Sequence, residues 1–320
     1  VSTDHRMEPQ MHTLITGAGQ IGTQLARDLV RAGHDVTVLR RGASPIPGAT
    51  VISGDAGDHT TLRRAAEGAT AIFHCIHAPY AVAAWRRELP QRELAVMDAG
   101  AELGIPVIFP ESVYAFGRDA RDLVESAACN PVSPLGEVRA ELLAARASHP
   151  ARTASVIASD LMGPTATKRS SVILGTVLTP AAAGTTAWVL GDPDAPHAVT
   201  SIPDLTRAML AAVPLASTRD TRLNAPTAEA RSQRQMAHDA ARIAGTSPGA
   251  VRSIPAALFG LCAPFSPTTR ELYHQRYLWA APVSLRPGRL MTEFGIEPTL
   301  WEHVLREWAQ PASAASTAAP

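Results

Sequence analysis

The sequence predicts an α/β fold built on a doubly wound parallel sheet, with a smaller C-terminal lobe. Three observations lead to this prediction. Short β-rich runs alternate with helical patterns up to about residue 158, a glycine-rich loop joins the first strand to the first helix, and the pattern becomes less regular and richer in Pro, Thr and Gly after about residue 160. Alternation of this kind is typical of parallel sheets, and irregular segments are often added at the carboxyl edge of such sheets.

The regular first part contains six expected strands and four expected helices. We expect strands at 12–15, 36–39, 50–52, 71–75, 107–109 and 155–158. The helices are expected at 21–32, 60–67, 82–103 and 137–147, and in the third we place Leu89, Leu94, Val96 and Met97 on one apolar face. Gly33 ends the first helix and Gly104 precedes a strand, as glycine often does after a helix. Later segments at 204–213, 227–244 and 298–309 are predicted to be helices.

These patterns divide the chain into four segments. We expect a disordered N-terminus at 1–10, a nucleotide-binding domain at 11–160, a partly interleaved substrate-binding lobe at 161–310 and a disordered tail at 311–320. Residues 170–191 carry no charge and are long enough to span a bilayer, but Gly175, Pro180 and Gly184 interrupt them. We therefore predict a buried helix and loop there.

The composition restricts the partners of this chain. It has 320 residues, 46% of them hydrophobic, and 29 basic residues balance 29 acidic ones, so nothing favours nucleic acid or a membrane surface. A small-molecule substrate is expected, with a homodimer as the assembly to test. The three cysteines are far apart, which favours neither disulfides nor a zinc site, and the first ten residues lack an apolar signal region. We expect a cytoplasmic protein.

The glycine-rich loop TGAGQIG, residues 16–22, has the spacing that accommodates a dinucleotide. Gly17 would allow the tight turn out of the strand, Gly19 would let a pyrophosphate approach the backbone, and Gly22 would let the helix pack closely. Gln20 and Ile21 open the helix, whose N-terminus would face the phosphates. Since the loop lies between a strand and a helix, it predicts a Rossmann-type domain, although a purely structural turn remains an alternative.

The end of the second expected strand indicates which dinucleotide is bound. An acidic residue there commonly binds the ribose hydroxyls of NAD, but this chain has Arg40 and Arg41. Guanidinium groups pair well with a 2′-phosphate, so we predict NADP rather than NAD as the cofactor. The alternative is that both are solvated loop arginines in a chain whose only lysine is Lys168.

Several motifs together resemble the short-chain dehydrogenase/reductase superfamily, in its extended or atypical NAD-dependent epimerase/dehydratase-like branch. The resemblance covers most of the chain. It rests on TGAGQIG, GDAGD at 54–58, FHCIHAPY at 73–80, FPESVYAFG at 109–117, SIPDL at 201–205 and EFGIEPTLWEHV at 293–304. It implies that Asp55 lies near the adenine of the cofactor.

The resemblance also implies a catalytic Ser or Thr, a Tyr, and a Lys four residues after the Tyr. In SPLGEVRAELL, residues 133–143, Leu135 replaces the tyrosine and Arg139 the lysine. Arg139 could still bind ribose hydroxyls, but its high pKa makes it a poor proton relay. Ser112 matches the catalytic hydroxyl.

Tyr114 is our candidate for a displaced proton donor. On a strand or its extension it would point to the same side as Ser112, and without a lysine we expect its pKa to stay near about 10. The alternative is an ordinary half-buried aromatic residue.

His77 is a reserve acid or base near the nicotinamide, and neither it nor His74 has a third partner at metal-ligand spacing. Four further residues resemble segments that close the substrate pocket, although core packing would explain them equally well: Asp160, Met162, Tyr273 and Trp279.

The leading hypothesis is an atypical NADP(H)-dependent reductase or isomerase of a small, apolar or aromatic carbonyl or hydroxyl compound. Two alternatives remain open, because the tyrosine and the lysine are both missing. One is a non-redox enzyme, catalysing dehydration or cyclisation, in which the nucleotide is only structural or absent. The other is a nucleotide-sensing regulator without turnover.

Overall fold

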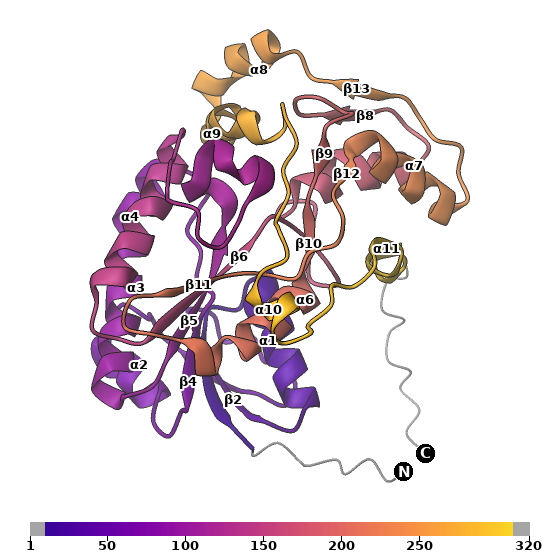
Figure 1. The fold of residues 1–320 in the computed structure, drawn as a ribbon. Coiled ribbons are helices and arrows are strands. Elements are labelled where there is room, and N and C mark those ends of the chain that lie inside the picture. The colour runs from indigo at the N-terminus through magenta and orange to yellow at the C-terminus, as the bar shows by residue number, and fades with distance from the viewer. Residues whose placement is uncertain (1–9, 310–320) are drawn as a thin grey trace, which may run out of the picture.

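The computed structural model describes residues 10–309, which are built around a seven-stranded sheet (Figure 1). Its strands are β1 (His12–Thr16), β2 (Asp35–Arg40), β3 (Thr50–Ser53), β4 (Ala71–His74), β5 (Val107–Ser112), β6 (Thr153–Ala158) and β11 (Thr221–Asn224). They follow the order β11-β6-β5-β4-β1-β2-β3, and every pairing between them is parallel. The predicted doubly wound α/β fold is therefore confirmed.

Helices cover both faces of this sheet, as Figure 1 shows. The helices α1 (Gln20–Arg31) and α6 (Ile202–Ala211) pack together on one face, and α2 (His59–Ala65), α3 (Val82–Leu103) and α4 (Pro134–Ser148) on the other. Neighbouring strand residues point to opposite faces, so Ile15 joins the core under α1 whereas Leu14 joins the core under α2 and α3.

The remaining elements lie mainly beyond the carboxyl ends of the strands and form the lobe at the top of Figure 1. Three short strand pairs are β7 (Asp160–Met162) with β10 (Val199–Ser201), β8 (Ala187–Val189) with β13 (Val251–Ser253), and β9 (Pro196–His197) with β12 (Arg231–Ser232). Longer helical elements are η1 (Val113–Asp122), η2 (Ile173–Leu178), α7 (Gln233–Ala244), α8 (Ala256–Cys262), α9 (Pro267–Gln275) and α11 (Trp301–Ala309). Short ones are α5 (Thr179–Ala182), η3 (Val213–Leu215), η4 (Ala263–Phe265), η5 (Arg276–Leu278) and α10 (Arg289–Thr292).

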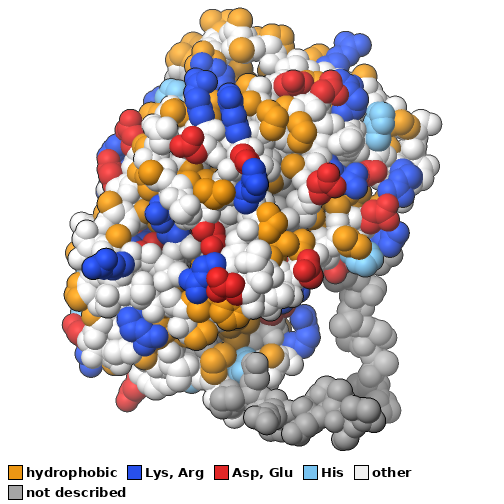
Figure 2. Space-filling view, in the orientation of Figure 1, with side chains coloured by type: hydrophobic (Ala, Val, Ile, Leu, Met, Phe, Trp, Pro, Cys, Tyr) orange, Lys and Arg blue, Asp and Glu red, His pale blue; other side chains and the backbone are white. Residues whose placement is uncertain are grey.

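The chain after residue 160 contributes to the sheet as well as to the lobe. β11 pairs with β6 at the edge of the sheet, and α6 packs against α1. On the face in view in Figure 2, basic and acidic side chains are intermixed, which is consistent with the equal numbers of the two.

Leu94 is the clearest error in the expected core. It is 49% exposed, whereas Leu89, Val96 and Met97 are buried as expected. Five residues along a helix correspond to about 140° of rotation, so Leu94 cannot share the face of Leu89. The buried position between them is instead Glu93.

Residues 170–191 are more broken than expected. They form η2, α5 and then β8, a strand that the sequence did not indicate. Within residues 10–309 no helix is both long enough and apolar enough to cross a membrane. The disorder expected at 1–10 and 311–320 concerns segments that, apart from Gln10, lie outside the described residues.

Candidate functional site

The glycine loop adopts the geometry that its spacing predicts. Gly17 has a φ of +91°, and a Cβ there would lie 3.0 Å from the carbonyl group of Cys75. A Cβ on Gly22 would lie 2.0 Å from the carbonyl oxygen of Gly17. By contrast, a Cβ on Gly19 would meet no heavy atom within 4 Å. Two glycines therefore allow tight packing, and the middle one leaves its backbone open to a ligand.

The start of α1 is held firmly beneath this loop. Gln20 is its first residue, and the carbonyl oxygen of Gln20 accepts a hydrogen bond from the hydroxyl of Thr165 at 2.7 Å. Ile21 packs against the core shared by α1 and α6. The helix N-terminus is thus fixed next to Gly19, where its positive dipole end can attract an anion.

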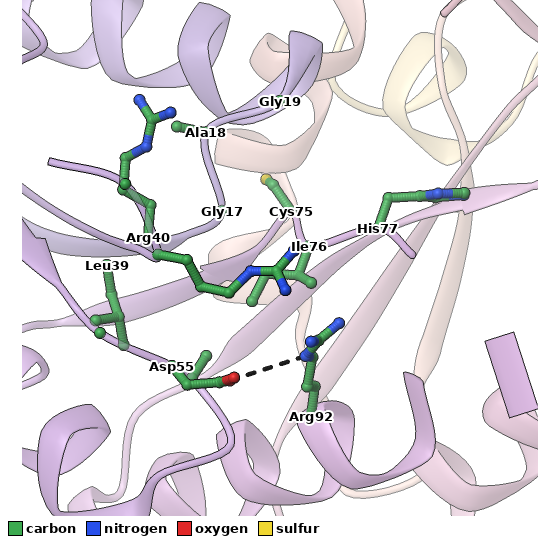
Figure 3. A pocket seen from close by; sticks show the side chains of 14 residues that line it. Gly17, Ala18, Gly19, Leu39, Arg40, Asp55, Cys75, Ile76, His77 and Arg92 are labelled. Atoms are coloured by element: carbon green, nitrogen blue, oxygen red, sulfur yellow. Dashed lines mark ion pairs between the residues drawn. The ribbon is translucent and has the colours of Figure 1, made fainter. Parts of the chain in front are cut away.

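A pocket of about 350 Å³ opens beside the loop (Figure 3). The carboxyl ends of β1, β2, β3 and β4 line one side of it, and one residue of α3 lines the other. The lining residues are Gly17, Ala18, Gly19, Leu39, Arg40, Arg41, Gly42, Gly54, Asp55, Ala56, Cys75, Ile76, His77 and Arg92. The predicted cofactor residues at the ends of the first three strands therefore do come together.

The charged groups of this pocket differ in how they are paired. Within residues 10–309, neither Arg40 nor Arg41 forms an ion pair. Asp55 accepts a hydrogen bond from the backbone N–H of Gly57 at 2.9 Å. Arg92, which the sequence analysis missed, donates to Glu88 at 2.8 Å. Among the basic side chains that line the pocket, Arg40 and Arg41 are thus the ones most available to bind an anionic ligand.

Leu135 occupies the position where the resembled family has its tyrosine, and it is fully buried. It packs in a cluster with Trp85, and two tyrosines, Tyr80 and Tyr114, pack against that same cluster. Their hydroxyl groups are 3.1 Å apart. A hydrogen-bonded pair of phenols therefore lies close to Leu135, and Tyr80 was not expected there.

Tyr114 differs from the prediction in two respects. β5 ends at Ser112, and Tyr114 lies in η1, so the argument that both share one face of a strand is wrong. The two are still neighbours, because the N–H of Tyr114 donates to the Ser112 hydroxyl at 3.5 Å. The expectation of a pKa near 10 is also wrong, because burial, and then the charge of Asp160, raise the pKa of Tyr114 well above that value.

Arg139 is buried and largely engaged by other groups. Its Nε donates to a carboxylate oxygen of Glu111 at 2.5 Å, and its Nη2 donates to the carbonyl of Pro110 at 3.3 Å. The same Glu111 oxygen accepts the backbone N–H of Ser112 at 2.7 Å. Arg139 thus holds the segment that carries Ser112, and its contact with the cofactor ribose stays a prediction.

The Arg139–Glu111 pair belongs to a longer buried chain of charges. Arg146 donates to the second oxygen of Glu111 at 2.9 Å and to both oxygens of Glu93 at 2.7 Å. The side chains of Arg146 and Glu111 are fully buried. This network of buried ion pairs was not predicted from the sequence, although a glutamate on the apolar face of the third expected helix indicated a buried charge.

The two histidines at the carboxyl end of β4 have different surroundings. Nδ1 of His77 donates to the carbonyl of Ala78 at 2.6 Å, which leaves Nε2 of the neutral ring as an acceptor. Burial, and then the charge of Arg139, lower the pKa of His77. Figure 3 places His77 at the end of the pocket away from Leu39. His74 is buried and bonded to Thr16, and burial, followed by the charge of Arg146, lowers its pKa to about 3.

Two of the four residues predicted to bind the substrate, Asp160 and Trp279, lie close together on the lobe side. The Asp160 carboxylate is 2.5 Å from Nε2 of His197, whose ring stacks on Trp279 with centroids 4.0 Å apart. Met162 is fully buried in the core of the lobe, and Tyr273 stacks instead under Arg276. The charge of Asp160 also contributes to the raised pKa of Tyr114, after burial. Within residues 10–309, no three His, Cys, Asp or Glu side chains are grouped as metal ligands would be.

Comparisons with known proteins give a family model and many similar folds. The model described as the NAD dependent epimerase/dehydratase family matches residues 13–224. A comparison with curated protein sequences finds no significant match.

Similar solved structures cover nearly all of the chain. The Bordetella bronchiseptica enzyme WbmG in complex with NAD has a TM-score of 0.72 at 19% identity, over 95% of each chain. UDP-glucose 4-epimerase of Thermotoga maritima with UDP-glucose has a TM-score of 0.70 at 16% identity, over 93% of this chain and 97% of the other. UDP-glucose 4-epimerase of Brucella ovis with NAD has a TM-score of 0.69 at 19% identity, over 93% and 97%. At these identities the likeness concerns the fold.

Proposed function

Because this chain belongs to the NAD dependent epimerase/dehydratase family, we propose that it binds NADP(H) and reduces or isomerises a small carbonyl or hydroxyl compound. The solved structures with this fold that contain NAD support a nicotinamide dinucleotide as the cofactor. The substrate is proposed to be apolar or aromatic, whereas one of the similar structures contains UDP-glucose.

The observation that carries this proposal is the open backbone of Gly19 next to Arg40 and Arg41, which form no ion pair within residues 10–309. A pyrophosphate at Gly19 would lie against the N-terminus of α1, which favours negative charge. A phosphate on the adenosine ribose would then be within the same pocket as the two arginines. Charge-assisted hydrogen bonds of this kind contribute about 1.5–3 kcal/mol each, enough to select NADP over NAD.

Two of the chain's own side chains would serve the reaction. When bound, the cofactor supplies or accepts the hydride. Ser112 would hold the substrate oxygen through its hydroxyl, since its backbone is fixed by Glu111. Tyr114 would donate a proton to that oxygen, because its raised pKa keeps the phenol protonated over the ordinary pH range. Reduction of a carbonyl is therefore favoured over oxidation of an alcohol.

Binding measurements test the cofactor assignment. NADPH and NADH should be titrated by fluorescence into the parent, into Arg40→Asp and into Arg31→Asp. Arg31 lies on α1, has a 74% exposed side chain and is not part of the pocket, so its substitution controls for the same change in charge. NADPH should bind more tightly than NADH, and only Arg40→Asp should narrow or reverse the difference. Equal affinities for the parent would refute NADP selectivity.

A non-redox function is the second candidate, and one observation favours it. Leu135 is fully buried and Arg139 is paired with Glu111, so the position of the family's tyrosine and lysine offers no free acid or base. A panel of ketones with NADPH separates the two candidates. Net consumption of NADPH supports the reductase, and conversion that requires the dinucleotide without consuming it supports the isomerase. Conversion by the nucleotide-free protein supports dehydration or cyclisation. Tight binding without any turnover would favour a nucleotide-sensing regulator.

A further inference from the structure

Arg92 is the one residue of the dinucleotide pocket that comes from a helix behind the sheet. It lies in the middle of α3, and its side chain is only 12% exposed. Figure 3 shows Arg92 and Asp55 pointing toward one another across the lower part of the pocket. No motif assigns a role to Arg92. We propose that its guanidinium plane packs on the adenine base of the dinucleotide, an inference that rests on the proposed function.

The order of the strands determines where the base would lie. β1, β2 and β3 are consecutive in the sheet, and the loops at their carboxyl ends carry Gly19, Arg40 and Asp55 in that order. A dinucleotide with its pyrophosphate at Gly19 and its adenosine ribose at Arg40 must place its base farther along, toward Asp55. Arg92 lies on this side, with its Nε 3.9 Å from the Asp55 carboxylate.

The ion-pair partners of Arg92 indicate whether its guanidinium binds a ligand through its positive charge or through its planar face. Its Nη1 is 2.8 Å from Glu88, and Asp55 is close to its Nε, so two carboxylates offset its positive charge. Arg40 and Arg41 have no such partners within residues 10–309 and suit the phosphate better. The hydrogen bond to Glu88 restrains the orientation of the Arg92 guanidinium. A fixed planar guanidinium stacks well on an aromatic face.

The apolar part of the pocket agrees with a base at this end. Leu39, Ala56 and Ile76 line the pocket together with Arg92. An aromatic base can pack on aliphatic side chains of this kind as well as on a guanidinium plane. Both NADPH and NADH carry this base, so Arg92 contributes affinity to each and no preference between them.

The test compares two arginines that share one carboxylate. Arg87 lies on the same helix and donates to the other oxygen of Glu88 at 2.7 Å, but it does not line the dinucleotide pocket. Arg92→Ala, Arg92→Lys and Arg87→Ala are each titrated with NADPH, NADH and 5′-AMP, after thermal unfolding has shown that each variant is folded. Because Arg87→Ala also removes one of the two arginines that bind Glu88, it is the control for that effect of the Arg92 variants.

Arg92→Ala should weaken NADPH and NADH by the same factor, about 3- to 30-fold, and 5′-AMP in parallel. Arg92→Lys should not restore the affinity, because lysine retains the charge but has no planar face. Arg87→Ala should bind as the parent does. A loss for NADPH alone would identify a phosphate contact and overturn the inference, as would full rescue by lysine or an unchanged Arg92→Ala. If the parent binds neither dinucleotide, the proposed function itself fails and the inference with it, whereas Arg40→Asp still changes the preference when only the inference fails.

Discussion

Replacing Arg146 with alanine should destabilise the folded protein by about 3–5 kcal/mol, because it removes one partner of a buried ion pair and leaves the other partner buried. The guanidinium of Arg146 is fully buried and lies 4.1 Å from the centroid of the Phe109 ring. It donates to both oxygens of Glu93, to Glu111 and to the hydroxyl of Ser155. Alanine would leave the two carboxylates in the interior without their shared partner.

The magnitude follows from the environment of those carboxylates. The side chain of Glu93 is 4% exposed and that of Glu111 is fully buried, so water cannot replace the lost hydrogen bonds without opening the core. Glu111 keeps Arg139, but Glu93 has no other ion pair within residues 10–309. Most of the loss should therefore come from Glu93, as an uncompensated buried charge.

Urea unfolding of the parent and three variants checks this prediction. Arg146→Lys keeps the charge but cannot reach both carboxylates with a planar fork, so it should lose about 1–3 kcal/mol. Arg234→Ala removes an exposed ion pair with Asp194 and should change stability by less than about 1 kcal/mol. A free energy of unfolding for Arg146→Ala within about 1 kcal/mol of the parent, at an unchanged denaturant slope, would refute the reasoning.

Three further predictions follow from the site. Gly19→Val should abolish binding of NADPH, measured by fluorescence, but leave thermal stability nearly unchanged, since its Cβ meets no protein atom within 4 Å; retained binding would show that the loop is only structural. Tyr114→Phe should cut turnover of any ketone that the parent reduces on the order of 10²–10⁴-fold, with unchanged nucleotide affinity, and activity close to the parent's would exclude Tyr114 as the proton donor. The buried His74 has a pKa lowered from 6.5 to about 3. As the pH falls, His74 therefore takes up a proton in the unfolded chain before it does so in the folded protein. The free energy of unfolding should drop by about 2 kcal/mol between pH 6.5 and 5, and this pH dependence should be absent from His74→Gln.

Local signals predicted the elements around the cofactor pocket closely. The helix expected at 82–103 has those same bounds in the structure, because its end is marked by Gly104 in a left-handed conformation. Pro90 inside that helix did not shorten it. The glycine loop was equally predictable, since its spacing, its strand and its helix are all adjacent in the sequence.

Contacts between distant segments could not be predicted in this way. The hydroxyls of Tyr80 and Tyr114 meet although the two residues are 34 positions apart, and nothing in either motif indicates that they meet. Tyr114 was expected on a strand or its extension, whereas the chain turns at Ser112, whose side chain caps η1. Arg92 likewise belongs to the pocket only through the packing of α3 against the sheet.

The pairing of β11 with β6 has a consequence for how the protein reaches its folded state. During synthesis, strands β1 to β6 emerge before β11, so the backbone edge of β6 remains unpaired until part of the lobe has been made. α6, which buries Leu205 and Met209 against the same core as α1, also emerges late. A fragment truncated near residue 160 would keep both a bare strand edge and an uncovered apolar face, and such edges promote aggregation. The nucleotide-binding half is therefore not expected to be stable as an independent fragment.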